Sequence, residues 1–332
     1  MPPRSPGNPV DIAISYYISD QIFLARLASN GTIIPGSVQR VANGVGGMPS
    51  GSIQSGNDFG WPLRYADDLD GDGIGDLLVP ARSDSSGGSS SGAVFILYLQ
   101  PGNETDPVRN YTKITRLDAR LSGLVGVGNS MGPAAMMSDL DGDGRRDMMI
   151  GVFNDDTGGT NRGAVVVAFM GGAVPSASPS PSPSPSPSPS ASPSPSVTPS
   201  PSPSPSAAAA GTVLSAVKIA DGLGGLPSDT LADSLFGLTI ASAGDLDGDG
   251  IDELAVTEQF NSDGGASTGA VWILFLHRNG TVRHFQKISA LAGGMTGVEA
   301  GSFFGRYPSR LDQPGGDEGH LLRLVVGAHH HQ

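Results

Sequence analysis

The nonapeptide Asp68-Leu-Asp-Gly-Asp-Gly-Ile-Gly-Asp76 and its two near copies decide the fold of this chain. The copies, Asp139-Leu-Asp-Gly-Asp-Gly-Arg-Arg-Asp147 and Asp245-Leu-Asp-Gly-Asp-Gly-Ile-Asp-Glu253, begin 71 and then 106 residues further along. The longer interval contains a Ser-Pro-rich tract of roughly 35 residues, and without it the period is again about 71. The chain is therefore built from repeats.

Each repeat has the same order of short apolar segments. An apolar run follows the nonapeptide, then a polar Gly-rich loop, a Gly-Ala-Val segment, a turn, and a segment containing Lys-Ile. The Gly-Ala-Val segments begin at Gly92, Gly163 and Gly269, and the Lys-Ile pairs at Lys113, Lys218 and Lys287. Four short strands per repeat is the content of one β-propeller blade. The 49 glycines and the absence of long helical patterns also favour an all-β class.

Fragments of the repeat stand at both ends. Asp11-Ile-Ala-Ile-Ser and Leu324-Val-Val-Gly-Ala both match the strand that follows the nonapeptide. We therefore expect a β-propeller of about four four-stranded blades, as part of a larger ring. The expected divisions are 10–172 and 212–328 for the two propeller parts and 173–211 for an insertion.

The insertion is almost pure Ser-Pro over residues 175 to 206. Such a composition cannot form a packed core, so we expect a disordered, polyproline II-like spacer. The flanking segments, Gly163-Ala-Val-Val-Val and Gly211-Thr-Val-Leu-Ser, match consecutive strands of one repeat. The tract is thus predicted to interrupt a hairpin turn, where long insertions cost little.

Composition limits the function. The net charge of −13 argues against nucleic-acid binding, which needs Lys and Arg. The sequence contains no apolar run of eighteen or more residues, so we expect no direct membrane insertion. Twelve of the 32 acidic residues stand at positions one, three, five and nine of the nonapeptides. Bound divalent cations would neutralise much of this charge.

The nonapeptides are predicted to be three Ca²⁺ sites. Carboxylates at positions one, three, five and nine and the main-chain carbonyl of position seven can converge when glycines allow a tight turn, and hard oxygen ligands suit Ca²⁺. The predicted ligands are Asp68, Asp70, Asp72, Ile74 and Asp76; Asp139, Asp141, Asp143, Arg145 and Asp147; and Asp245, Asp247, Asp249, Ile251 and Glu253. An EF-hand is excluded because its twelfth position, a bidentate Glu, is here Val79, Ile150 or Val256.

This pattern resembles the FG-GAP repeat of integrin α-subunit propellers. The resemblance rests on Phe59-Gly60 and Phe236-Gly237, each nine residues before its loop, and on Val79-Pro80-Ala81 after the first loop. It covers nearly everything except residues 172 to 211, and implies a structural role for Ca²⁺ within the blades.

Two departures from the FG-GAP pattern matter. The second repeat has Met131-Gly132 in place of Phe-Gly. After Phe304-Gly305, the segment Asp312-Gln-Pro-Gly-Gly-Asp317 has lost the loop spacing. No calcium site is predicted in the segment from Asp312 to Asp317, nor at Asp11.

One face of the propeller is predicted to be free. In the order of strands that the resemblance implies, the metal loops lie on the same face as the turns between the third and fourth strands of each repeat, here called the third-to-fourth turns. The insertion and the N-glycosylation sequons at Asn30, Asn103 and Asn279 are predicted to lie in these turns. A further sequon stands at Asn110. The opposite face, made by loops 82–92, 154–163 and 259–269, is left for a ligand.

The sequons and the resemblance of the Ser-Pro tract to those of extracellular-matrix glycoproteins favour an extracellular or cell-surface location, although no signal peptide is visible at the N-terminus.

The predicted function is therefore binding: a calcium-containing adhesion module for an extracellular protein or glycan. Two alternatives stay open: a non-catalytic propeller appended to an extracellular hydrolase of the phospholipase D type, and a structural matrix glycoprotein. We do not expect an enzyme. Gly88-Ser-Ser-Ser-Gly92 fits a nucleophile pattern but lies in a loop before a strand, not in a strand-to-helix turn.

Overall fold

The computed structural model describes residues 12–100, 105–171, 210–232, 234–305, 309–310 and 324–325. Every regular element in these residues is a β-strand apart from one short 3-10 helix, η1 (Tyr17–Ser19). No helix in this part of the chain is long and apolar enough to cross a membrane.

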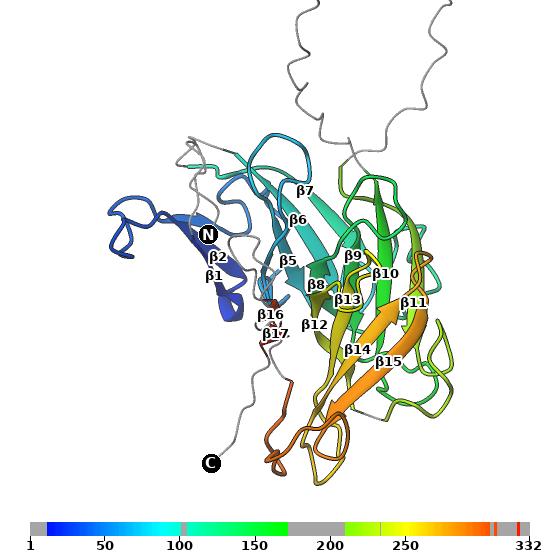
Figure 1. The fold of residues 1–332 in the computed structure, drawn as a ribbon. Helices are drawn as coiled ribbons and strands as arrows, with labels where there is room; N and C mark the ends of the chain where they lie inside the picture. The colour runs from blue at the N-terminus through cyan, green and yellow to red at the C-terminus, as the bar shows by residue number, and fades with distance from the viewer. Residues whose placement is uncertain are drawn as a thin grey trace, which may run out of the picture.

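The strands form antiparallel sheets in chain order, and we name the first four A to D (Figure 1). Sheet A contains β1 (Ile12–Tyr16), β2 (Gln21–Ala25) and β3 (Gln39–Val41). Sheet B contains β4 (Arg64–Tyr65), β5 (Leu77–Ala81), β6 (Ala93–Leu99) and β7 (Val108–Thr115). Sheet C contains β8 (Met131–Met136), β9 (Met148–Val152), β10 (Ala164–Gly171) and β11 (Thr212–Ala220). Sheet D contains β12 (Phe236–Gly244), β13 (Glu253–Glu258), β14 (Ala270–Leu276) and β15 (Val282–Ser289). A further pair is formed by β16 (Ser309–Arg310) and β17 (Leu324–Val325).

This is the all-β, propeller-type arrangement that the repeats predict. Each of sheets B, C and D pairs only strands that are neighbours along the chain, and β8 contacts both β4 and β12, the first strands of the adjacent sheets. Sheet A differs from the expected four-stranded blade, because the described residues supply it with three strands. Its strand β1 holds the second-strand position, as the match of Asp11-Ile-Ala-Ile-Ser to that strand implies.

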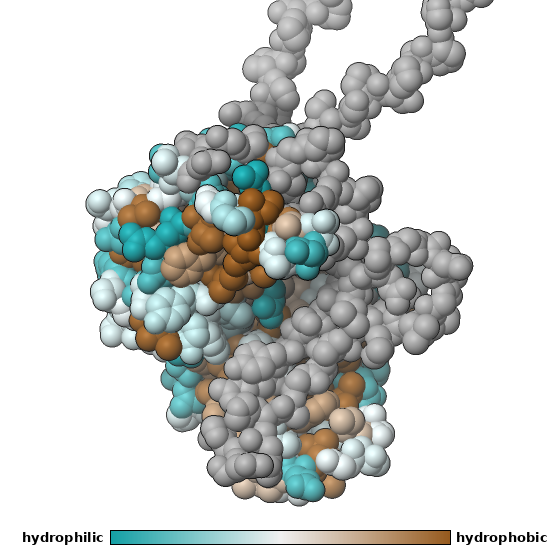
Figure 2. Space-filling model, turned by 90° about the vertical axis from the view of Figure 1, so that its left-hand side faces the viewer, coloured by the Kyte–Doolittle hydropathy of each residue, from teal (hydrophilic) through white to brown (hydrophobic). Residues whose placement is uncertain are grey.

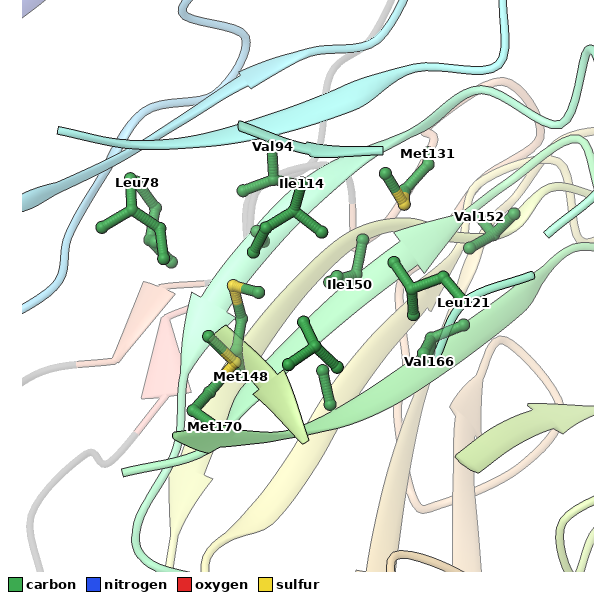
Figure 3. Packing of buried hydrophobic residues seen from close by; sticks show 14 of the residues in the cluster. Leu78, Val94, Ile114, Leu121, Met131, Met148, Ile150, Val152, Val166 and Met170 are labelled. Carbon is green, nitrogen blue, oxygen red and sulfur yellow. The ribbon is translucent and has the colours of Figure 1, made fainter. Parts of the chain in front are cut away.

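Neighbouring sheets pack face to face. Strands β5, β6, β9 and β10 are buried along their whole length, as expected of strands covered on both sides. Between sheets B and C, Leu78, Val94 and Ile114 lie against Met148 and Ile150 in one apolar cluster (Figure 3). Sheet A leaves Ile12, Ile14 and Tyr16 exposed, and Figure 2, viewed from the side of this sheet, shows apolar side chains gathered on the surface.

The glycine before each Ala-Val segment has a steric reason. Gly92 and Gly163 form parallel bridges with Met131 and Phe236, the residues at the Phe-Gly position of the next repeat. A Cβ atom on Gly163 would lie 2.0 Å from the carbonyl oxygen of Phe236, and Gly163 has φ +82°. Only glycine tolerates both conditions. The Phe-Gly and Gly-Ala-Val motifs are therefore two halves of one contact between successive sheets.

Strands β10 and β11 pair although they flank the Ser-Pro tract. Gly171 is paired with Thr212, and the register continues to Ala164 and Ala220. Residues 172–209 lie outside the described residues, as do Asn103, Asp11 and the segment Asp312 to Asp317.

Candidate metal centre

The nonapeptides lie between the first and second strands of sheets B, C and D and share one backbone conformation. The aspartate at position one accepts hydrogen bonds from three main-chain N–H groups within its own loop. For Asp68 the donors are Gly71, Asp72 and Gly73, at 2.7, 3.0 and 2.7 Å. Asp139 and Asp245 accept from the same three positions.

Glycines at positions four and six make this turn possible. Gly71 and Gly73 have φ values of 81° and 87°, and the corresponding glycines of the other two loops are also in the left-handed region. Glycine adopts that conformation without steric cost. The Asp-Gly-Asp-Gly pattern therefore wraps the main chain around the first carboxylate.

The carboxylate at position nine is buried in every loop, and in the first two loops it accepts a hydrogen bond from the third strand of its sheet. Asp76 is fully buried; its Oδ2 accepts from Leu69 N–H at 2.9 Å and its Oδ1 from Leu99 N–H at 3.1 Å. Asp147 repeats this with Leu140 and Met170. The register of the third and fourth strands shifts next to Leu99 and Met170, so a β-bulge stands beside these N–H groups.

Positions one, three and nine come together in every loop. Carboxylate oxygens of the three residues lie within 4.8 Å of one another in each case. The groups are Asp68, Asp70 and Asp76; Asp139, Asp141 and Asp147; and Asp245, Asp247 and Glu253. Such oxygen-only clusters suit a hard divalent cation.

Positions five and seven have different surroundings. The carboxylates of Asp72, Asp143 and Asp249 do not belong to the three groups. Their Oδ1 atoms accept the main-chain N–H of position seven, from Ile74, Arg145 and Ile251, at 2.8 to 2.9 Å. It remains a prediction that these carboxylates and the main-chain carbonyl oxygens of position seven are calcium ligands.

Two carboxylate oxygens in these loops are buried without a hydrogen-bond partner among the described residues. They are Oδ1 of Asp70 and Oε1 of Glu253. Glu253 is fully buried, and its other oxygen accepts from Leu246 N–H. An unpaired buried carboxylate oxygen is costly, so both atoms fit a bound cation.

Burial also raises the pKa of the ninth-position groups. Desolvation is the largest cause, partly offset by the main-chain hydrogen bonds, and the neighbouring carboxylates raise the values further. The pKa of Asp76 rises to about 7, that of Asp147 to about 6 and that of Glu253 to about 7. A positive charge in the cluster would reverse this effect.

Two arginines that were not predicted from the sequence form ion pairs with carboxylates of the first and third loops. Arg109 of β7 pairs with Asp70 and, at 3.1 Å, with Asp72. Arg283 of β15 pairs with Asp247 and, at 3.2 Å, with Asp249. The signal that could have found them is the dipeptide Val-Arg, which follows the third-to-fourth turn in both repeats.

A comparison with known families identifies the repeat. The sequence model of the FG-GAP repeat matches residues 236–274. The chain contains an FG-GAP repeat. The matched segment runs from Phe236, the first residue of β12, through the third loop and β13 to Leu274 in β14.

The FG-GAP repeat is a non-catalytic propeller element, and sheets B and C have the strand order and loop placement of the matched sheet D. No curated protein matches the chain.

Proposed function

We propose that the chain binds three Ca²⁺ ions, one in each FG-GAP loop, and that each ion stabilises the connection between the first and second strands of its own blade. The ninth-position carboxylate gives the strongest support for this proposal. It is buried beside two other carboxylates, and in Glu253 one carboxylate oxygen has no hydrogen-bond partner in the described part of the chain. In the presence of an ion, Asp68, Asp70 and Asp76, with their counterparts in the other loops, would supply its ligands. The ion would replace carboxylate repulsion by attraction.

Thermal unfolding tests this proposal. An ion that binds only the folded chain adds about 2.7 kcal/mol of stability per site at a concentration one hundred times its dissociation constant. We expect the midpoint of unfolding to rise when Ca²⁺ replaces a chelator. Glu253→Gln should retain only part of the rise. An unfolding midpoint that is identical with Ca²⁺ and with chelator would reject the proposal.

We further propose that the chain is an extracellular binding module whose ligand, a protein or glycan, meets the face made by loops 82–92, 154–163 and 259–269. One contact supports a shared face for the metal loops and the third-to-fourth turns: Arg278 in the turn of sheet D donates to the main-chain carbonyl of Leu140 in the second loop at 3.4 Å. Sequon residues Asn30 and Asn279 lie on turns of the same kind and are exposed. The loops 82–92, 154–163 and 259–269 themselves contain no sequon and no insertion.

A glycan placed as a steric block distinguishes the two faces. Ala266→Asn creates an Asn-Ser-Thr sequon at an exposed position of loop 259–269. The protein, produced in a secretory host, would be applied to arrays of extracellular-matrix proteins and glycans. The unaltered protein, glycosylated at its own sequons, should bind, and Ala266→Asn should lose that binding. Equal binding by both would assign the ligand to another surface.

A further inference from the structure

The three FG-GAP loops are not equivalent, because only two of them receive an arginine from the fourth strand of the sheet. The strand registers define the corresponding positions: Val108, Val213 and Val282 are paired with Leu99, Met170 and Leu276. The next residue along the chain is Arg109 in sheet B and Arg283 in sheet D. In sheet C it is Leu214, which is 39% exposed.

Both arginines bind the same pair of carboxylates. Arg109 contacts Oδ2 of Asp70 and of Asp72, and Arg283 contacts Oδ2 of Asp247 and of Asp249. In each loop these are positions three and five. The guanidinium therefore neutralises part of the charge that a divalent cation would neutralise.

The second loop is different in kind. Its Arg145 belongs to the loop itself and contacts Asp143 at 3.3 Å. Among the described residues, Asp141 at position three has no ion pair with a basic side chain. The third-position carboxylate of this loop thus lacks the guanidinium partner that Asp70 and Asp247 have. The guanidinium of Arg278 also reaches the second loop, but it donates to the main-chain carbonyl of Leu140.

We propose that Arg109 and Arg283 are built-in counter-cations that compete with Ca²⁺, so that the second loop fills at the lowest calcium concentration. A guanidinium on Asp70 or Asp247 puts a unit positive charge a few ångströms from a doubly charged ion. Two such charges repel, so the ion either displaces the arginine or binds beside it at a cost. This proposal rests on the proposed calcium binding and adds an order to it.

A titration that reports each loop separately tests the order. The main-chain N–H of position six donates to the first aspartate in every loop, from Gly73, Gly144 and Gly250 at 2.7, 2.7 and 2.9 Å. In protein labelled with ¹⁵N-glycine, the amide resonance of each residue follows its own site as CaCl₂ is added. We expect Gly144 to respond at the lowest concentration.

Exchange of the residues between sheets tests the cause. Arg109→Ala should lower the calcium midpoint at Gly73 by about two- to fivefold, the size expected for an exposed charge interaction, and leave Gly144 and Gly250 unchanged. Leu214→Arg, at an exposed position, should raise the midpoint at Gly144 by a similar factor. Arg40→Ala, which removes an exposed arginine from sheet A, controls for the change in net charge.

The outcomes separate this proposal from the calcium sites themselves. Equal midpoints at the three glycines, together with no effect of Arg109→Ala and Leu214→Arg, would overturn the competition and leave calcium binding intact. No response of any of the three amides to millimolar Ca²⁺ would overturn both.

Discussion

Ser138 and Asp252 exchange two hydrogen bonds across the boundary between sheets C and D. The N–H of Asp252 donates to Oγ of Ser138 at 3.2 Å, and the N–H of Ser138 donates to Oδ2 of Asp252 at 3.3 Å. Ser138 precedes the second loop and Asp252 is position eight of the third. One boundary earlier, Arg146 at position eight of the second loop pairs with Asp67, which precedes the first. At both boundaries, position eight of one metal loop therefore contacts the residue that precedes the metal loop of the sheet before it.

The first prediction concerns this junction. Asp252→Ala removes an acceptor from the N–H of Ser138 and from the hydroxyl of Ser242, which donates to Asp252 at 2.8 Å. Since Asp252 is buried, we expect a loss of about 1 to 3 kcal/mol in the free energy of unfolding, measured by urea denaturation. Glu299→Ala, an exposed acidic residue, should change stability by less than about 0.5 kcal/mol. Equal stabilities for the two variants would show that the junction contributes nothing.

A second prediction separates backbone strain from close packing. Gly163 and Gly128 both have φ +82°, but a Cβ on Gly128 would meet nothing within 4 Å, whereas one on Gly163 would clash with Phe236. Gly128→Ala should cost about 1 to 2 kcal/mol, the price of a left-handed alanine alone. Gly163→Ala should cost about 3 kcal/mol or more, because overpacking adds to that strain. If urea denaturation finds the two losses equal, the contact between successive sheets does not require glycine.

The loops and strand order could be read from the sequence because their causes are local. Glycines at positions four and six set the turn around Asp68, and the Gly-Ala-Val segment and the segment after the turn pair as neighbours in the chain. The arginines could not be placed in this way. Arg109 meets Asp70 only because the fourth strand lies beside the loop once the sheet has formed. The contact of Ser138 with Asp252, 114 residues apart, depends on how two sheets pack, which no local pattern specifies.

A third prediction uses the pKa values of Asp76, Asp147 and Glu253. These are raised in the folded chain, so without metal the three groups contribute stability that is fully present below their unfolded values near 4 and is lost as the pH rises through about 6 to 7. Calcium needs the ionised forms. Its binding should therefore release protons at pH 6 and release none at pH 8.5, with weaker affinity at the lower pH.

Calorimetry in two buffers of different ionisation enthalpy measures the protons released per ion bound. Glu253→Gln removes one of the three titrating groups and should lower the release at pH 6. Proton release that is the same at pH 6 and pH 8.5 would contradict the assignment of these carboxyl groups to the calcium sites.

The last prediction concerns the Ser-Pro insertion, whose flanks Gly171 and Thr212 are paired. The corresponding pair in sheet D is His277 and Thr281, joined by a main-chain hydrogen bond of 2.8 Å and connected by Arg278-Asn279-Gly280. Replacing everything between Gly171 and Thr212 by Arg-Asn-Gly should therefore close the β10–β11 hairpin without changing its register. Loop-closure entropy predicts a gain of about 2 kcal/mol from shortening a loop of roughly 40 residues to three. The unfolding midpoint of the shortened protein should rise, and its response to Ca²⁺ should be unchanged. A shortened chain that fails to fold would mean that the tract is required to join the two strands.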